Sequence, residues 1–167
     1  HSATEFVAWY NGHPDFADRR FSLDTERAVV IGNGNVALDV ARMLLMSAEQ
    51  LRRTDVADHA LTALSNSRIH EVVVLGRRGP ANAAFTVPEL LELAGLNDID
   101  VRIECPSEPS WHDDQSAHPL RLSLLRELAN RRPRGHAKRV VLRFLASPIE
   151  LIGGERVESL SWSRNRL

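Results

Sequence analysis

The sequence VVIGNGNVA at residues 29–37 is typical of a strand, a tight glycine turn and a helix in direct succession. Val29–Ile31 is short and apolar throughout, which predicts a parallel strand buried on both faces. Apolar residues then recur with helical spacing at Val36, Ala37, Val40, Ala41, Leu44 and Leu45. This order constrains the fold more than any other feature, because it places the turn where a strand ends and a helix begins.

The small residues of this turn suit a bound dinucleotide. Gly32 lets the chain reverse sharply, Gly34 leaves room for a pyrophosphate against the backbone, and Ala37 lets the helix approach the sheet closely. The amides of the turn would then face an anion at the N-terminus of the helix. Packing alone also selects small residues between a strand and a helix, so the pattern G-x-G-x-x-A by itself leaves both interpretations open.

Length and composition indicate one domain with a sizeable core, because the chain has 167 residues of which 43% are hydrophobic. The formal net charge of -1 gives no bulk attraction to nucleic acid or to an anionic membrane. No apolar run approaches the ~20 residues of a membrane span. Cys105 is the single cysteine and cannot form an internal disulfide, which favours a cytoplasmic setting. A start at His1 without methionine suggests a domain excised from a longer protein.

The remaining patterns alternate between strands and helices. An aromatic cluster in residues 1–26 predicts a short helix and a loop packed on the flank of the domain. Helices are expected at 35–49, 54–64, 86–94 and 119–128, strands at 72–75, 101–105 and 140–145, an exposed loop at 106–118, and a hairpin of 148–152 with 156–162 around Gly153-Gly154. Thr54 is the expected N-cap of its helix, and Leu120 is the first of the leucines that share one face of the last helix. The strands at 72–75 and 140–145 are apolar and should be buried, whereas only every second residue of 101–105 is apolar, which predicts a strand near an edge. Alternation indicates an α/β fold, a three-layer Rossmann-like domain with a mainly parallel sheet, flanking helices and a C-terminal β-hairpin.

Two arginines follow the second strand. In NAD-binding folds this position carries an Asp or Glu that accepts hydrogen bonds from the ribose 2′-hydroxyl. Arg77 and Arg78 stand here instead, and a guanidinium can bind a 2′-phosphate that a carboxylate would repel. The residues therefore predict NADP rather than NAD, although a solvated loop is the alternative. The interval from Gly32 is 77 − 32 = 45 residues, longer than the usual ~20, and the additional helix at 54–64 accounts for it.

These segments together resemble a known family. The sequence GNGNVALDVAR at 32–42, with GRRGP at 76–80, AFT at 84–86 and Glu89-Leu90, is similar to the NADP-binding domain of adrenodoxin-reductase-like ferredoxin-NADP reductases, within the FAD/NAD(P)-binding superfamily. The opening FVAWYNG at 6–12 also resembles the crossover that leads out of the FAD domain in that family. On this resemblance, residues 1–26 are the crossover, 27–146 the dinucleotide-binding core and 147–167 the hairpin.

The resemblance implies an enzyme in which NADPH gives a hydride to FAD, and FAD passes single electrons to a ferredoxin or a similar iron-sulfur protein. It implies that Asn33, Gly34, Asn35 and Val36 contact the pyrophosphate, together with the Gly32 turn. It also implies that Arg77 and Arg78 hold the 2′-phosphate, that Glu89 touches the nucleotide, and that Glu92 lies near the nicotinamide and flavin as an acid or proton relay. FAD would be held mainly by a domain outside this chain, so the chain alone is expected to be inactive.

Alternatives remain at several points. Thr86-x-x-Glu89 is also the pattern of a capping box, in which the two side chains satisfy amides at a helix start. Asp39 and Arg42 have the spacing of an ordinary helix ion pair. The scattered histidines, His112 and His118 included, predict no metal site. The whole chain could instead be a non-catalytic NADP-binding module, or the NADPH domain of another two-dinucleotide flavoprotein such as the reductase part of a glutamate synthase.

Overall fold

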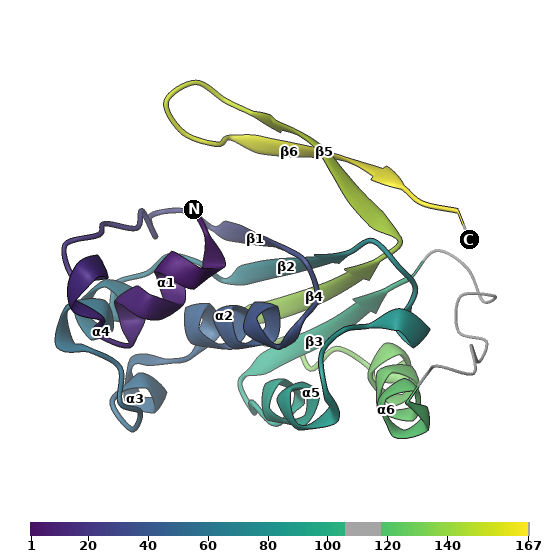
Figure 1. Ribbon diagram of the computed structural model, residues 1–167. Coiled ribbons are helices and arrows are strands. Elements are labelled where there is room, and N and C mark those ends of the chain that lie inside the picture. Colours follow the sequence, from purple (N-terminus) through teal and green to yellow (C-terminus); the bar gives the residue numbers. More distant parts are fainter. Residues whose placement is uncertain (106–117, 167) are drawn as a thin grey trace.

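The computed structural model describes residues 1–105 and 118–166, which form an α/β fold around a parallel sheet of four strands (Figure 1). The strands lie in the order β1-β2-β4-β3, with bounds β1 Arg27–Ile31, β2 Glu71–Gly76, β4 Lys138–Phe144 and β3 Ile99–Glu104. Strands β2 and β4 are central and largely buried, as their apolar sequences predicted. The alternating pattern of β3 correctly predicted a strand at the edge.

The helices cover one face of this sheet (Figure 1). They are α1 Ala3–Tyr10, α2 Asn35–Leu45, α3 Ala48–Leu51, α4 Asp58–Ser65, α5 Val87–Ala94 and α6 Pro119–Asn130, with two short 3-10 turns at Pro14–Phe16 and Pro80–Asn82. The main core lies between these helices and the inward residues of the strands, such as Val72, Val74, Val140 and Leu142. The aromatic residues Phe6 and Trp9 of α1 belong to this core, so the predicted packing of the N-terminal cluster is confirmed.

The other face is covered in part by a hairpin. Strands β5 Ala146–Ile152 and β6 Ser159–Arg164 pair antiparallel, with a bulge between Pro148 and Glu150. A second, smaller core of Val73, Leu75, Val141 and Ala146 joins the hairpin to the sheet, with Leu160 packed against it. The third layer of the fold is thus the hairpin.

The expectation that the first strand is buried on both faces is wrong. Val29 is 40% exposed and Ile31 is 56% exposed, whereas Ala28 and Val30 pack against the core. Strand β1 lies at an edge of the sheet and pairs only with β2. The hairpin leaves the outward side chains of β1 uncovered, so an entirely apolar strand sequence did not mean burial on both faces here.

The connection between β1 and β2 also differs from expectation. The helix predicted to run to residue 49 ends at Leu45, and Ser47 begins the separate helix α3 through a capping box with Gln50. Thr54 is not an N-cap, because its hydroxyl donates to the carbonyl of Leu51 and α4 begins only at Asp58. Three helices therefore fill the long interval between the glycines and the arginines.

Helix α6 begins at Pro119, as predicted, but Leu120 is exposed and Leu122 takes a buried position instead. The loop predicted at 106–118 lies outside the described residues except for His118, and so does His112.

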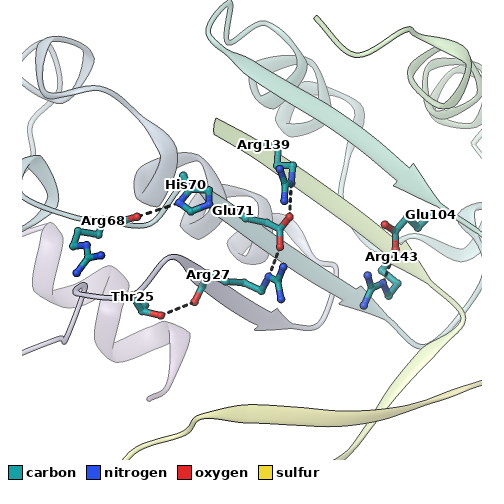
Figure 2. A network of polar contacts seen from close by, with 8 residues as sticks. All are labelled: Thr25, Arg27, Arg68, His70, Glu71, Glu104, Arg139 and Arg143. Carbon is teal, nitrogen blue, oxygen red and sulfur yellow. Dashed lines mark hydrogen bonds and ion pairs between the residues drawn. The ribbon is translucent and has the colours of Figure 1, made fainter. Parts of the chain in front are cut away.

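An ion-pair ladder joins three strands at their amino ends (Figure 2). Glu71 of β2 lies in register with Arg27 of β1 and with Arg139 of β4, and accepts hydrogen bonds from both guanidinium groups. Burial alone would raise the pKa of the Glu71 carboxyl, but these hydrogen bonds hold it below its usual value. The ladder lies at the end of the sheet opposite to the glycine turn and links β1, β2 and β4 side by side.

Candidate nucleotide-binding site

The glycine turn connects the carboxyl end of β1 to the amino end of α2. Gly32 has a φ of +111°, which favours glycine, and its N–H donates to the carbonyl of Leu75 on β2 at 2.9 Å. Gly34 is the N-cap residue of α2 and no side chain caps the helix. The sharp reversal predicted at Gly32 and the strand-turn-helix order are therefore confirmed.

The start of α2 has free hydrogen-bond donors and free space. Among the described residues, no atom accepts a hydrogen bond from the N–H groups of Gly34, Asn35 or Val36. A Cβ atom added to Gly34 would meet nothing within 4 Å, so the protein's own packing does not require a glycine there. Unpaired amides at the positive end of a helix, with open space beside a glycine, fit a phosphate group.

The two asparagines of the turn have different structural positions. A Cβ atom added to Gly76 would lie 2.5 Å from Nδ2 of Asn33, so the glycine at the end of β2 makes room for this side chain. The Asn33 Nδ2 atom is buried and has no partner among the described residues. The Oδ1 atom of Asn35 accepts a hydrogen bond of 2.8 Å from the N–H of Thr86, which joins the starts of α2 and α5. Sequence reasoning identified neither contact.

Arg77 and Arg78 follow β2 directly, and both side chains are exposed. Neither guanidinium has a hydrogen bond or an ion pair to any described residue. Because β1 and β2 are adjacent and parallel, the arginines and the glycine turn lie at the same edge of the sheet, the one formed by the carboxyl ends of the strands. Two unpaired cations next to free helix amides make this edge suitable for a ligand that carries several phosphates.

Glu89 lies in the first turn of α5, near the glycine turn through the bond between Asn35 and Thr86. The predicted capping box is wrong, because the Thr86 hydroxyl donates to the Glu89 carboxylate and the Thr86 N–H donates to Asn35 instead. The exposed carboxylate of Glu92 lies two turns into the same helix and forms an ion pair with Arg42 of α2 at 3.2 Å. Glu92 is thus the candidate residue that the structure places farthest along α5 from the turn.

Arg42 also belongs to a network with Asp39. The predicted helix pair is confirmed by a hydrogen bond of 2.6 Å from Arg42 to Asp39, and the hydroxyl of Tyr10 donates to the same carboxylate. Burial raises the pKa of the Tyr10 hydroxyl, and its hydrogen bond to Asp39 raises it further. The network ties α1, α2 and α5 together beneath the site.

The described ranges 1–105 and 118–166 contain no candidate metal centre and no candidate membrane span. No group of histidine, cysteine or carboxylate residues there could hold a metal ion. No helix in the same ranges is long and apolar enough to cross a membrane. Cys105 is partly buried just beyond β3 and is not in a disulfide.

Known proteins similar to this chain are NADPH-ferredoxin reductases. The reductase FprA of Mycobacterium tuberculosis is 49% identical over 172 residues, a match that covers 99% of this chain and 38% of FprA. A probable ferredoxin/ferredoxin-NADP reductase of Mycobacterium bovis is 60% identical over 98 residues, 59% of this chain and 17% of that protein. The mitochondrial NADPH:adrenodoxin oxidoreductase of Arabidopsis thaliana is 51% identical over 105 residues, 62% of this chain and 22% of that protein. No protein-family model matches the chain.

Solved structures agree with these relatives. The structure of Mycobacterium tuberculosis FprA in complex with NADPH matches with a TM-score of 0.90 and 48% identity, over 99% of this chain and 37% of that one. Nearly the whole of this chain is matched, but it spans less than two fifths of the length of FprA. These findings confirm the predicted fold and the resemblance to ferredoxin-NADP reductases.

Proposed function

We propose that this chain is the NADP(H)-binding part of a flavin-dependent ferredoxin-NADP reductase. The observation that carries the proposal is the pair of unpartnered guanidinium groups, Arg77 and Arg78, at the same edge as the free amides of the Gly34 turn. Support also comes from the similarity over 99% of the chain to a reductase whose solved structure holds NADPH.

Each group at this edge has a distinct role in the proposal. The amides of Gly34, Asn35 and Val36 bind the pyrophosphate, since they are free donors at a helix N-terminus. Asn33 lies against Gly76 between the two strand ends and keeps the turn beside the arginine pair. Arg77 and Arg78 bind the 2′-phosphate with charge-assisted hydrogen bonds, each worth about 1.5–3 kcal/mol. NAD lacks that phosphate, so the arginines distinguish the two nucleotides.

Bound NADPH supplies a hydride, which the complete reductase would pass to FAD and then, as single electrons, to a ferredoxin or a similar iron-sulfur protein. The protein's part in that transfer is to hold one ring system against the other. FAD is proposed to bind mainly outside this chain, whose sequence contains one glycine-rich strand-turn-helix. The single cysteine of the chain favours a cytoplasmic location for the enzyme.

Glu89 and Glu92 are proposed to contribute at α5. Glu89 lies in the first helical turn and accepts a hydrogen bond from the hydroxyl of Thr86, whose N–H bonds to Asn35. From this position Glu89 is proposed to touch the nucleotide. Glu92 is proposed as an acid or proton relay near the nicotinamide, with Arg42 as the partner that holds its carboxylate. The role proposed for Glu92 requires the flavin, which the complete enzyme would place near the nicotinamide.

The test uses the full-length protein that contains this chain. Reduction of a ferredoxin in the presence of NADPH should be rapid and should be much slower with NADH at the same concentration. A full-length protein that binds NADP but reduces neither ferredoxin nor an artificial acceptor would contradict the enzymatic part of the proposal and would favour a non-catalytic NADP-binding module.

A further inference from the structure

The turn that carries the arginines is held by the C-terminal hairpin. The Nδ2 atom of Asn165 donates to the main-chain carbonyl of Arg77 at 2.7 Å, and the N–H of Leu145 donates to the carbonyl of Arg78 at 3.1 Å. Both contacts come from residues just outside the parallel sheet, one before β5 and one after β6. The side chains of the arginines have no partner among the described residues, so these two bonds anchor the turn through its backbone.

Asn165 makes further bonds that fix its own position. Its N–H donates to the carbonyl of Leu145 at 2.8 Å, and its Nδ2 also donates to the hydroxyl of Ser147 at 2.9 Å. Leu145 has a φ of +55°, a conformation that non-glycine residues adopt rarely and keep only where neighbouring contacts require it. The bonds to Arg78 and Asn165 on its two sides are such contacts.

The hairpin in turn is fixed to the sheet. Ala146 and Leu160 pack on Val73, Leu75 and Val141 in the second core. The guanidinium of Arg143 on β4 lies 4.8 Å from the ring centre of Trp162 on β6 and bonds to Glu104 of β3 at 2.7 Å. These contacts hold the hairpin on the sheet. Asn165, directly after β6, can therefore position the arginine turn.

We propose that Asn165 is a positioning residue for nucleotide specificity, which sets the preference for NADP over NAD through the backbone of Arg77. This inference rests on the proposed function, because it assigns the 2′-phosphate to the arginine pair. An arginine side chain is long, and it loses rotamer freedom when it binds a phosphate. If the backbone turn that carries the side chain is also mobile, binding must order both the turn and the side chain. The affinity for the 2′-phosphate is then lower. The pyrophosphate contacts at Gly34 do not depend on Asn165, so the loss should fall on NADP alone.

The experiment measures the dissociation constants of NADP+ and NAD+ by calorimetric titration for the wild-type chain and for Asn165→Ala. The variant should lower the preference for NADP+ by about tenfold, the effect expected when one anchoring hydrogen bond is lost. Asn165→Asp is the second variant, since it keeps the size of the side chain and cannot donate to the Arg77 carbonyl. Asn66→Ala is the control, because Asn66 also donates Nδ2 to a main-chain carbonyl, that of Thr62 at 3.0 Å, and it caps the carboxyl end of α4.

The possible results separate this inference from the proposed function. A wild-type chain that does not prefer NADP+ would overturn both. A wild-type preference that survives in both Asn165 variants would overturn the inference and leave the proposed function standing. Equal losses for NADP+ and NAD+, or a failure of both variants to fold, would show a general structural role for Asn165 and would also overturn it.

Discussion

Gly34 and Gly76 differ in what an added side chain would meet. A Cβ atom on Gly76 would overlap Asn33, so this glycine serves the packing of the protein itself. A Cβ atom on Gly34 would meet no protein atom within 4 Å. If Gly34 is restricted, a ligand must restrict it, as in the close approach of a backbone to a pyrophosphate.

We expect Gly34→Val to abolish NADP+ binding and leave the fold intact, because valine can adopt the extended conformation of this residue (φ −86°, ψ −179°). The circular dichroism spectrum should be unchanged, and NADP+ should no longer raise the melting temperature. Gly154→Val is the control, since a Cβ atom there also meets nothing within 4 Å and Gly154 lies in the hairpin loop. Retained binding in Gly34→Val would mean that the phosphates lie elsewhere.

At the scale of the elements, the Glu71 ladder makes the sheet sensitive to pH. The pKa of Glu71 lies below its usual value of about 4.3 in the folded state. A carboxyl of this kind stabilises the fold fully above its unfolded pKa, and the contribution is lost as the pH falls through the lower folded pKa. The free energy of unfolding should therefore decrease below about pH 4.

Glu71→Gln should reduce the free energy of unfolding at pH 7 by about 1–3 kcal/mol and remove this part of the pH dependence, because two arginines lose a buried partner. Urea unfolding at pH 7 and at pH 3.5 checks both effects. Glu49→Gln is the control, since its pair with Arg53 is 75% exposed on both sides and should contribute less than about 1 kcal/mol. Similar values for the two variants would contradict a structural role for the ladder.

The sequence predicted the strands and the hairpin well because their apolar runs are short and bounded by glycine, proline or charge. It failed where a local contact competes with a repeating pattern. The capping box of Ser47 and Gln50 divides a helix that hydrophobic spacing alone would continue. The sequence of a single strand also does not show which strands lie beside it in the sheet. The exposure of Val29 on an edge strand could therefore not be predicted.

The same limit holds at the candidate site. Residue types and order predicted the glycine turn and the arginine pair, because their chemistry is local. The contacts of Asn35 with Thr86 and of Asn165 with Arg77 join positions 51 and 88 residues apart, and no pattern in the sequence records them. The supposed capping box failed because a distant asparagine took the bond that a local glutamate was expected to make.

At the scale of the whole molecule, the two faces of the sheet are unequal. Helices pack on one face and form the main core with it, whereas the hairpin covers only part of the other face. Among the described residues, the glycine turn at the start of α2 and the unpaired arginines after β2 lie at the same edge. We propose that one dinucleotide binds there, at the carboxyl ends of β1 and β2.

The purified chain should therefore bind NADP+ and show no flavin absorbance and no NADPH-dependent dye reduction. The sequence holds one glycine-rich strand-turn-helix, and the arginine pair is proposed to select the nucleotide with a 2′-phosphate. An absorbance scan and a dye-reduction assay check the absence of flavin and turnover, and a thermal-shift series with NADP+ checks binding. Flavin bound to the isolated chain, or turnover by it, would contradict this division of roles.

The nucleotide preference of the double variant Arg77→Ala with Arg78→Ala directly tests the proposed binding of the 2′-phosphate. Calorimetric titration of wild type and double variant with NADP+ and NAD+ should show a loss of roughly 100-fold or more in NADP+ affinity, because two charge-assisted contacts are removed. The affinity for NAD+ should change little, since NAD+ has no 2′-phosphate to bind. Equal losses for the two nucleotides would contradict the role proposed for the arginines, and with it the selection of NADP at this edge of the sheet.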